Sequence, residues 1–436
     1  MVNENQAKRD IERLAEQSAC DLLTAFPTLK AADQMEKRRR IMNAMLLPQT
    51  SAARLMAVLR NDSSFGDLRG GWIQCGNIGR RMQDHVVPLL LIESIIDGHS
   101  AKSFVDEALA FADCRRSTAE TYTPLAGATV EKAVSLGDGI DLVPWADVPD
   151  SFQKTSFDSD SSNHELASSW QITPQMPATG NSAIRIRVED CQILFSSRED
   201  DKAEIEALSG NFSAKFVKKE DVVRCIIAQS ERPVAVLGYW TQFDKKIAHE
   251  FGKASHSYDE ARSDKKVHTM SAGPMVLDGE SIAGLFHRFV ELNSSEKKVM
   301  RISLDRLSQA LWGGALVDKA IDLGIALEVM LLHGIDENNR GELKYRSSIR
   351  GAAFLGGNNQ ERLKTFKNLK NAYDLRSKAV HSGDLPQKYK GEPSHETLNR
   401  ATSICAHIAR ELIDKGSFPN WEDEYVVGGQ CRDPDL

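Results

Sequence analysis

Residues 359–383 read NQERLKTFKNLKNAYDLRSKAVHSG, a stretch in which apolar side chains recur at helical spacing. Five of them follow one another at intervals that place them on one face of an α-helix: Leu363, Phe366, Leu369, Tyr373 and Val380. Arg376 falls on the same predicted face and interrupts it. A guanidinium in an apolar face is costly unless it is paired or lines a cleft, so this helix carries the first candidate functional residue.

The segments around this helix also have helical patterns. Helices are predicted over residues 281–292, 297–332 (a pair), 342–355, 359–380 and 396–414. Glycines at 334, 341, 356, 357 and 383 stand where helices commonly end. The C-terminal part of the chain is therefore predicted to be an all-α bundle of four or five helices with short connections.

The remainder of the chain has two characters. Helical spacing is predicted over residues 5–60, 86–96 and 104–112, interrupted around 63–79. A β-hairpin with its turn at Gly137-Asp-Gly139 is predicted over 130–143, further strands over 184–188, 193–195 and 233–240, and polar linkers over 151–182 and 255–266. We therefore predict a multidomain protein with a helical N-terminal region (1–122), a mixed α/β middle region (123–279), a helical-bundle domain (280–418) and a C-terminal tail (419–436).

Composition narrows the class of protein. The chain has 436 residues, 41% hydrophobic and 27% charged, which is typical of a globular protein of more than one domain. It shows no apolar signal core, no apolar run long enough to span a bilayer, and seven scattered cysteines without a C-x-x-C pair. We expect a cytoplasmic protein that has no membrane partner and binds no metal.

Charge is unevenly distributed. The chain carries a net charge of −7, but nine basic and two acidic residues give the segment 344–378 a net charge of +7. Such a segment indicates a local affinity for anions. The alternative is a solvated helix face whose acidic partners lie elsewhere in the fold.

An arginine followed at short distance by a histidine occurs four times: Arg80 and His85, Arg262 and His268, Arg376 and His381, Arg400 and His407. Because there are four such pairs, spacing alone selects none of them. The setting favours Arg376 and His381, since the arginine interrupts an apolar face and the histidine ends the same helix just before Ser382 and Gly383. The dipole at that end of a helix favours a cation.

Three blocks of sequence together resemble a known family. They are DLGIALEVMLL at 322–332, ELKYRSSIR at 342–350 and YDLRSKAVH at 373–381. In this order they are similar to the Apea-like branch of the HEPN superfamily of ribonucleases, whose R-x(4–6)-H motif corresponds here to Arg376 and His381. The resemblance covers about residues 280–415, under a third of the chain.

The resemblance implies metal-independent RNA cleavage, without a cofactor, at a composite site that two HEPN domains form in a homodimer. The ribose 2′-hydroxyl attacks the adjacent phosphorus, leaving a 2′,3′-cyclic phosphate and a 5′-hydroxyl. A histidine can accept the proton of the nucleophile or donate one to the leaving oxygen, which suits His381. A planar, permanently charged guanidinium stabilises the phosphorane, which suits Arg376.

A structural role for Arg376 is also open. Glu328 breaks an apolar stripe in the earlier helical segment 297–332 and is the predicted ion-pair partner of this arginine. Such a pair could be purely structural, or it could orient a catalytic arginine.

Five further residues are candidates for supporting roles. Arg346 and Arg350 are expected to be structural or to position RNA, and Lys378 is expected to contact phosphate. Asp374 lies off the predicted apolar face. Ser377 is a candidate for RNA binding or support, at a position where many HEPN nucleases have a more strongly polar residue, which leaves its auxiliary role open.

The predicted function is a regulated endoribonuclease that acts as a toxin or an anti-phage defence effector. RNA is the expected partner, with transfer RNA one candidate beside messenger and ribosomal RNA, and a regulatory protein or a phage component is the expected trigger. Two alternatives are a non-catalytic HEPN module for dimerisation or for binding RNA or nucleotides, and the toxin of a HEPN–nucleotidyltransferase pair.

Overall fold

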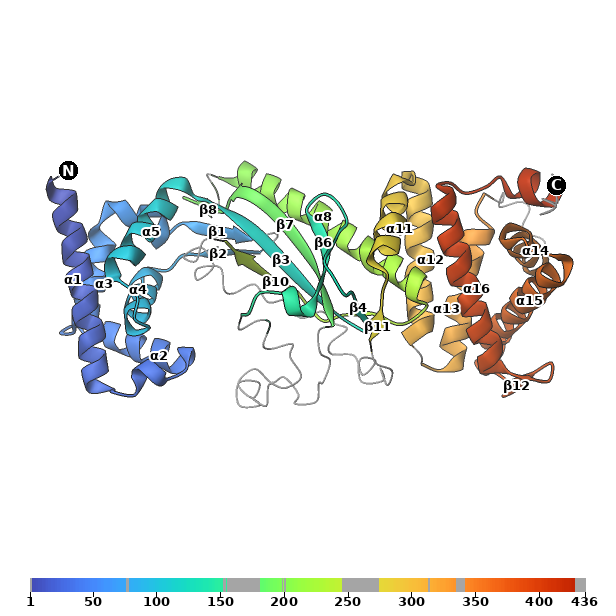
Figure 1. Cartoon of the computed structure of the whole chain (residues 1–436), viewed down its shortest axis with the longest axis horizontal. Helices are drawn as coiled ribbons and strands as arrows, with labels where there is room; N and C mark the ends of the chain where they lie inside the picture. The colour runs from blue at the N-terminus through green and yellow to red at the C-terminus, as the bar shows by residue number, and fades with distance from the viewer. Residues whose placement is uncertain are drawn as a thin grey trace. The chain divides into compact units, whose positions relative to one another are not determined.

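The computed structural model describes residues 2–75, 78–151, 154, 181–197, 199, 201–244, 274–312, 314–334 and 342–427. In these residues the chain is mostly helical with small sheets, as predicted for a multidomain helical and mixed protein (Figure 1). It divides into two compact units: Met1–Tyr122, Ile186–Phe216 and Tyr239–Ser257 form unit 1, and Thr123–Arg185, Val217–Gly238 and Tyr258–Leu436 form unit 2. Among the described helices, none has the length and apolar character needed to cross a membrane.

Unit 1 contains the helices predicted near the N-terminus. They are α1 (Val2–Ala25), α2 (Gln34–Met45), α3 (Ser51–Asn61), α4 (Val86–Ile96) and α5 (Ala101–Cys114), with short 3₁₀ helices η1 (Leu29–Ala31) and η2 (Ser63–Arg69). Asp33 and Thr50 cap α2 and α3, because each side chain accepts a hydrogen bond from a free backbone N–H of the first turn. The helices enclose an apolar core that includes Ile11, Leu55 and Phe111.

The break predicted around residues 63–79 of the helical N-terminal region contains a small sheet that was not predicted. The strands β1 (Trp72–Cys75) and β2 (Ile78–Arg81) form an antiparallel sheet that β8 (Leu194–Phe195) extends. The strand β1 does not show the alternation of apolar and polar residues that predicts a strand, because both of its faces are covered. Ile73 and Gln74, on opposite faces, are 2% and 4% exposed.

A second sheet has the strand order β10-β3-β7-β6-β5, with β9 beside β3. Its strands are β3 (Arg116–Ala126), β5 (Val134–Ser135), β6 (Ile140–Pro144), β7 (Ser182–Gln192), β9 (Ala235–Val236) and β10 (Trp240–Phe243). The turn η3 (Trp145–Asp147) follows β6, helix α8 (Lys202–Ser230) follows β8, and β4 (Ala128–Thr129) pairs with β11 (Met275–Val276). The boundary between the units falls within β3, β7 and α8.

The hairpin predicted over 130–143 is confirmed in a shorter form. β5 pairs with β6, with Val134 opposite Leu142, and Gly137, Asp138 and Gly139 all have positive φ in the turn. The strand predicted over 233–240 is instead two short strands, β9 and β10. Most of the linker predicted over 151–182 and all of that over 255–266 lie outside the described residues.

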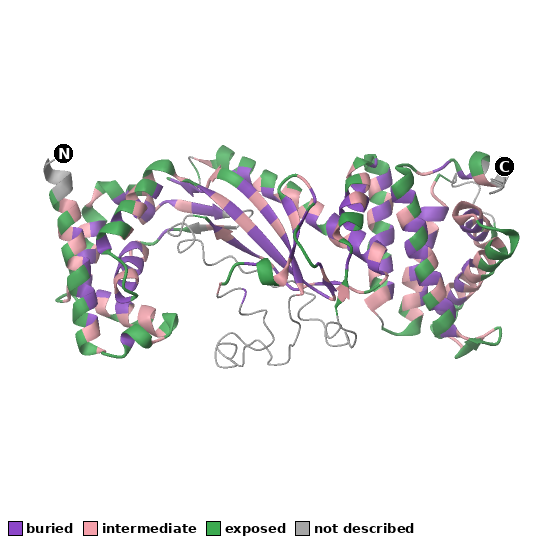
Figure 2. Cartoon of the chain, in the orientation of Figure 1, coloured by how far each residue is buried: buried purple, intermediate pink, exposed green. Residues whose placement is uncertain are grey.

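The C-terminal part of unit 2 is a bundle. Six helices are described, at the positions of the predicted helical segments, where a bundle of four or five was expected: α11 (Gly279–Glu291), α12 (Ser294–Trp312), α13 (Leu316–Leu331), α14 (Leu343–Leu355), α15 (Asn359–Ser382) and α16 (Ser394–Lys415). A hairpin of β12 (Lys388–Tyr389) and β13 (Glu392–Pro393) joins α15 to α16, and a π-helical turn, η7 (Glu422–Val427), follows. Buried positions form stripes along these helices (Figure 2), and α15 packs against α13, α14 and α16.

Helix α15 has clear ends but a different buried face from the one predicted. Asn358 and Glu361 form a capping box at its start, and Gly383, with φ of 68°, ends it. Leu363 and Val380 are 51% and 50% exposed. The buried positions are Leu369, Ala372, Leu375 and Ala379. The prediction placed the buried face wrongly because it followed the large apolar residues, whereas two of the four buried residues are alanines.

Candidate functional site

Arg376 of α15 lies against α13. Its Nη2 atom is 3.3 Å from Oε2 of Glu328, so the ion pair predicted between these two residues is confirmed. Gly324 stands one helical turn before Glu328, and a Cβ atom there would lie only 2.4 Å from Cγ of Arg376. The aliphatic part of the arginine therefore crosses α13 at this glycine, a contact that the sequence pattern does not reveal.

The guanidinium of Arg376 is only partly satisfied. Its Nε atom and Oε1 of Glu328 are buried and have no hydrogen-bond partner among the described residues. Its Cζ atom lies 5.7 Å from the centroid of the Tyr373 ring, and its side chain remains 26% exposed. Burial, followed by the negative charge of Glu328, raises the pKa of Tyr373 above its ordinary value. This arrangement holds the arginine in place, and because Nε is buried, an anion can reach only the terminal Nη atoms of the partly exposed side chain.

His381 lies in the last turn of α15 and is exposed. Five positions along a helix correspond to about 7.5 Å of rise and a rotation of about 140°, so His381 and Arg376 do not share a face. Neither a hydrogen bond nor an ion pair joins them, although both belong to the described chain. The residues on the side of His381 are Ser377 and Lys378, four and three positions earlier.

Asp374 is at the centre of a separate polar cluster. Its two carboxylate oxygens accept hydrogen bonds from Nζ of Lys344 (2.6 Å) and from the hydroxyl of Tyr389 (2.8 Å), and Nζ of Lys390 lies 3.7 Å away. Burial opposes the charged form, but the bonds from Lys344 and Tyr389 outweigh it and hold the pKa of Asp374 below its ordinary value. Burial and the bond to Asp374 raise the pKa of Tyr389 to about 12. The cluster connects α14, α15 and the β12–β13 hairpin.

The other residues predicted to support the site differ in how far their side chains are exposed. Arg350 is 2% exposed and donates from Nη1 to the Leu331 carbonyl (2.8 Å), which is a structural role. Arg346 is half-buried, and its side chain has no polar partner in the part of the chain that the structure describes. Lys378 is exposed, with Nζ 5.6 Å from the Tyr389 ring centroid.

The competing arginine–histidine pairs lack such a setting where they are described. Arg400 pairs with Glu392 and Glu396, and Nε2 of His407 lies 3.4 Å from Glu411. The side chain of Arg80 and the pair Arg262 and His268 lie outside the described residues. In the ranges that are described, no group of three His, Cys, Asp or Glu residues is placed to hold a metal ion.

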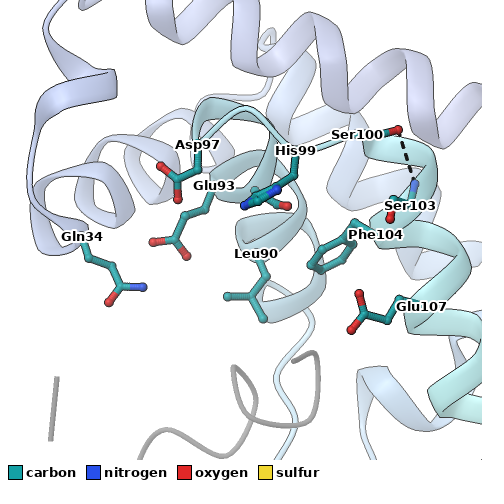
Figure 3. A pocket seen from close by; sticks show the side chains of 10 residues that line it. Gln34, Leu90, Glu93, Asp97, His99, Ser100, Ser103, Phe104 and Glu107 are labelled. Atoms are coloured by element: carbon teal, nitrogen blue, oxygen red, sulfur yellow. Dashed lines mark hydrogen bonds between the residues drawn. The ribbon is translucent and has the colours of Figure 1, made fainter. Parts of the chain in front are cut away.

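Unit 1 has a pocket of about 120 Å³ that the sequence did not predict (Figure 3). It lies between α4 and α5 and is lined by Glu93, Asp97 and His99, among others. Arg38 pairs with Glu93 at 2.8 Å and Lys37 pairs with Asp97 at 2.7 Å. Two of the carboxylates in this pocket are therefore already neutralised by the protein itself.

Comparisons of the chain with protein-family models, with curated proteins and with solved structures give no match. The function is therefore inferred from the residues of the bundle.

Proposed function

We propose that this protein is a metal-independent endoribonuclease of the HEPN type in which Arg376 and His381 act on RNA. The observation that supports the proposal best is the state of Arg376. One carboxylate oxygen, one aromatic ring and one glycine position hold its side chain, which remains 26% exposed, and a guanidinium has more N–H donors than this single ion pair uses. Phosphate is the anion that a planar fork of N–H donors fits well.

The chemistry needs no more than these two side chains and the RNA. His381 of one subunit accepts the proton of a ribose 2′-hydroxyl, the 2′-oxygen bonds to the adjacent phosphorus, and the 5′-oxygen leaves with a proton from the partner subunit's His381. Arg376 stabilises the negative charge of the phosphorane. Since Arg376 and His381 point about 140° apart on α15, two copies of the bundle in a homodimer can bring the histidine of one to the arginine of the other.

An RNase of this kind must be restrained in its own host. We place the protein among regulated toxins or anti-phage effectors, with a regulatory protein or a phage component as its trigger. Transfer RNA, whose loops are unpaired, is one candidate target.

The second candidate function is a binding module without catalysis. The absence of a direct contact between Arg376 and His381 within one chain favours it. In that case Arg376 and Glu328 stabilise the bundle, and the basic segment binds RNA without cutting it.

Cleavage of total cellular RNA in EDTA separates the two candidates. We expect the wild type to cut and to leave cyclic-phosphate ends, and His381→Ala and Arg376→Ala to lose about 10²–10⁴-fold of the rate, the usual contribution of acid–base catalysis. The matched control is His407→Ala, which removes another exposed helix histidine and should keep full activity.

Circular dichroism and sedimentation must show that each inactive variant is folded and has the wild-type oligomeric state. If the His381→Ala protein cuts RNA as fast as the wild type, the proposed catalytic role is contradicted. The second candidate function, a binding module without catalysis, then remains.

A further inference from the structure

Helices α14 and α15 carry an exposed aromatic and apolar surface, which we call the α14–α15 face and define by Tyr345, Leu363 and Phe366. Tyr345 and Leu363 are 50% and 51% exposed, and Phe366 is half-buried. The Tyr345 and Phe366 rings meet edge to face, with centroids 5.8 Å apart and planes at 81°. Figure 1 shows the two helices side by side near the end of the chain.

Cations surround this face. Nζ of Lys370 lies 5.7 Å from the centroid of the Phe366 ring, and the half-buried Arg346 follows Tyr345 in α14, about 100° around the helix. Lys364 and Lys367 are exposed on α15, and no ion pair occupies them in the described part of the chain. The surface therefore combines stacking groups with positive charge, and no described acidic residue pairs with Lys364, Lys367 or Lys370.

We propose that the α14–α15 face binds single-stranded RNA, with bases stacked on Tyr345 and Phe366 and phosphates at the surrounding cations. Exposed aromatic rings in a basic groove are the usual means of holding unpaired nucleic acid, because every base has a stacking surface. Bases inside a duplex are already stacked and cannot reach such rings. The inference rests on the proposed function and assigns it a substrate class, unpaired RNA.

The face continues toward the proposed catalytic arginine. Phe366 and Tyr373 stand seven positions apart on α15, two turns and about 10.5 Å of rise, on nearly the same side of the helix. The Arg376 guanidinium lies over the Tyr373 ring at 5.7 Å. A strand stacked on Phe366 is thus directed along α15 to the arginine that we expect to contact the scissile phosphate.

A second copy of this chain is the other possible occupant. In a two-fold dimer, a surface patch meets the identical patch of the other subunit. The cations of this face would then approach their own copies, and like charges across an interface cost several kcal/mol. An anionic partner is the better fit.

The test measures fluorescence anisotropy of a labelled 2′-O-methyl RNA of about a dozen nucleotides, within the usual site size. The blocked 2′-oxygen prevents cleavage, so binding is read separately from catalysis. We expect Tyr345→Ala to weaken binding about tenfold, the effect of losing one base stack, and Tyr345→Phe to bind as the wild type does. Ile302→Ala, which truncates an exposed side chain of α12 that is 40% exposed, is the control and should change nothing.

A self-complementary duplex of the same length should bind more weakly than the single strand, and sedimentation of Tyr345→Ala should match that of the wild type. Equal binding by Tyr345→Ala and wild type overturns the inference, even if the wild type still cuts cellular RNA. Dissociation of a dimer by Tyr345→Ala, with RNA affinity unchanged, also overturns it and makes the face a subunit interface. If Tyr345→Ala loses binding and the wild type cuts no RNA, the result supports RNA binding at the α14–α15 face and contradicts only the proposed nuclease activity.

Discussion

At the scale of single residues, Gly324 decides where Arg376 can lie. A methyl group at this position would stand 2.4 Å from Cγ and 3.0 Å from Cβ of Arg376, atoms close to the helix backbone that cannot swing aside. We therefore expect Gly324→Ala to displace the arginine from Glu328, to lower the free energy of unfolding by about 1–3 kcal/mol as overpacking does, and to reduce RNA cleavage.

Gly284→Ala in α11 is the matched control. An added Cβ there meets no atom closer than 3.5 Å, at the end of the flexible Arg288 side chain. Replacing glycine by alanine inside a helix usually stabilises it by about 0.5–1 kcal/mol, so this variant should keep or gain stability. Urea unfolding of both variants checks the prediction. It is wrong if Gly324→Ala is as stable as Gly284→Ala.

The same residues show how much of the site the sequence could reveal. The pairing of Arg376 with Glu328 was predictable, because each charged residue interrupts an apolar pattern and needs a partner. Gly324 was not, since a glycine inside a helix carries no pattern of its own. The orientation of His381 relative to Arg376 follows from helix geometry alone, whereas any contact of His381 with the proposed RNA or second copy does not.

At the scale of elements, helices were predicted well and strands unevenly: the strands predicted over 184–188 and 193–195 correspond to β7 and β8, whereas β1, β2 and most of β3 were not predicted. Helices such as α4 and α16 have enough turns for their periodicity to show, and glycines mark ends such as that of α15. Several strands have only two residues, too few for alternation, and their pairing depends on segments distant in the chain, as for β1 and β8. The buried face of α15 was misplaced because Ala372 and Ala379 pack closely without being large.

The cluster around Asp374 predicts a dependence of stability on pH. A carboxyl whose pKa is lower in the folded chain stabilises it above the unfolded pKa of about 4, and this contribution is lost as pH falls further. Tyr389, with a pKa raised to about 12, stabilises the fold below the unfolded value of about 10, and this is lost as pH rises toward 12. The link between α15 and the β12–β13 hairpin should be strongest between these limits.

Two variants test the acid and alkaline limits separately. At neutral pH, Asp374→Asn and Tyr389→Phe should each lower the free energy of unfolding by about 1 kcal/mol, the value of one hydrogen bond. The deficit of Asp374→Asn should shrink below about pH 4, and that of Tyr389→Phe above about pH 10. Denaturant unfolding across this range measures both, and a deficit that stays constant with pH means that the cluster is not what stabilises the hairpin.

At the scale of the whole molecule, charge is divided sharply. The chain has a net charge of −7, whereas residues 344–378 carry +7, so the remaining residues together carry −14. An acidic protein repels nucleic acid over most of its surface, and attraction is confined to the basic segment. Part of that segment is unavailable, because Lys344 pairs with Asp374 and Arg350 is buried.

The cations left free predict how binding responds to salt. Each phosphate neutralised on a single strand releases counterions and contributes about −0.7 to the slope of log K against log salt concentration. If Arg346, Lys364, Lys367 and Lys370 each meet one phosphate, the slope is about −3. Lys364→Gln combined with Lys367→Gln should make it shallower by about 1.4, because two of these contacts are lost.

The control is Lys297→Gln combined with Lys298→Gln, which removes the same charge from α12. Anisotropy titrations of the 2′-O-methyl RNA between about 50 and 200 mM salt give the slopes. Both double variants change the net charge of the chain equally, so a general electrostatic effect alters both slopes by the same amount. A change confined to the Lys364 and Lys367 variant shows that phosphates lie on α15. Equal changes would mean that RNA responds only to the total charge and has no fixed position on this face.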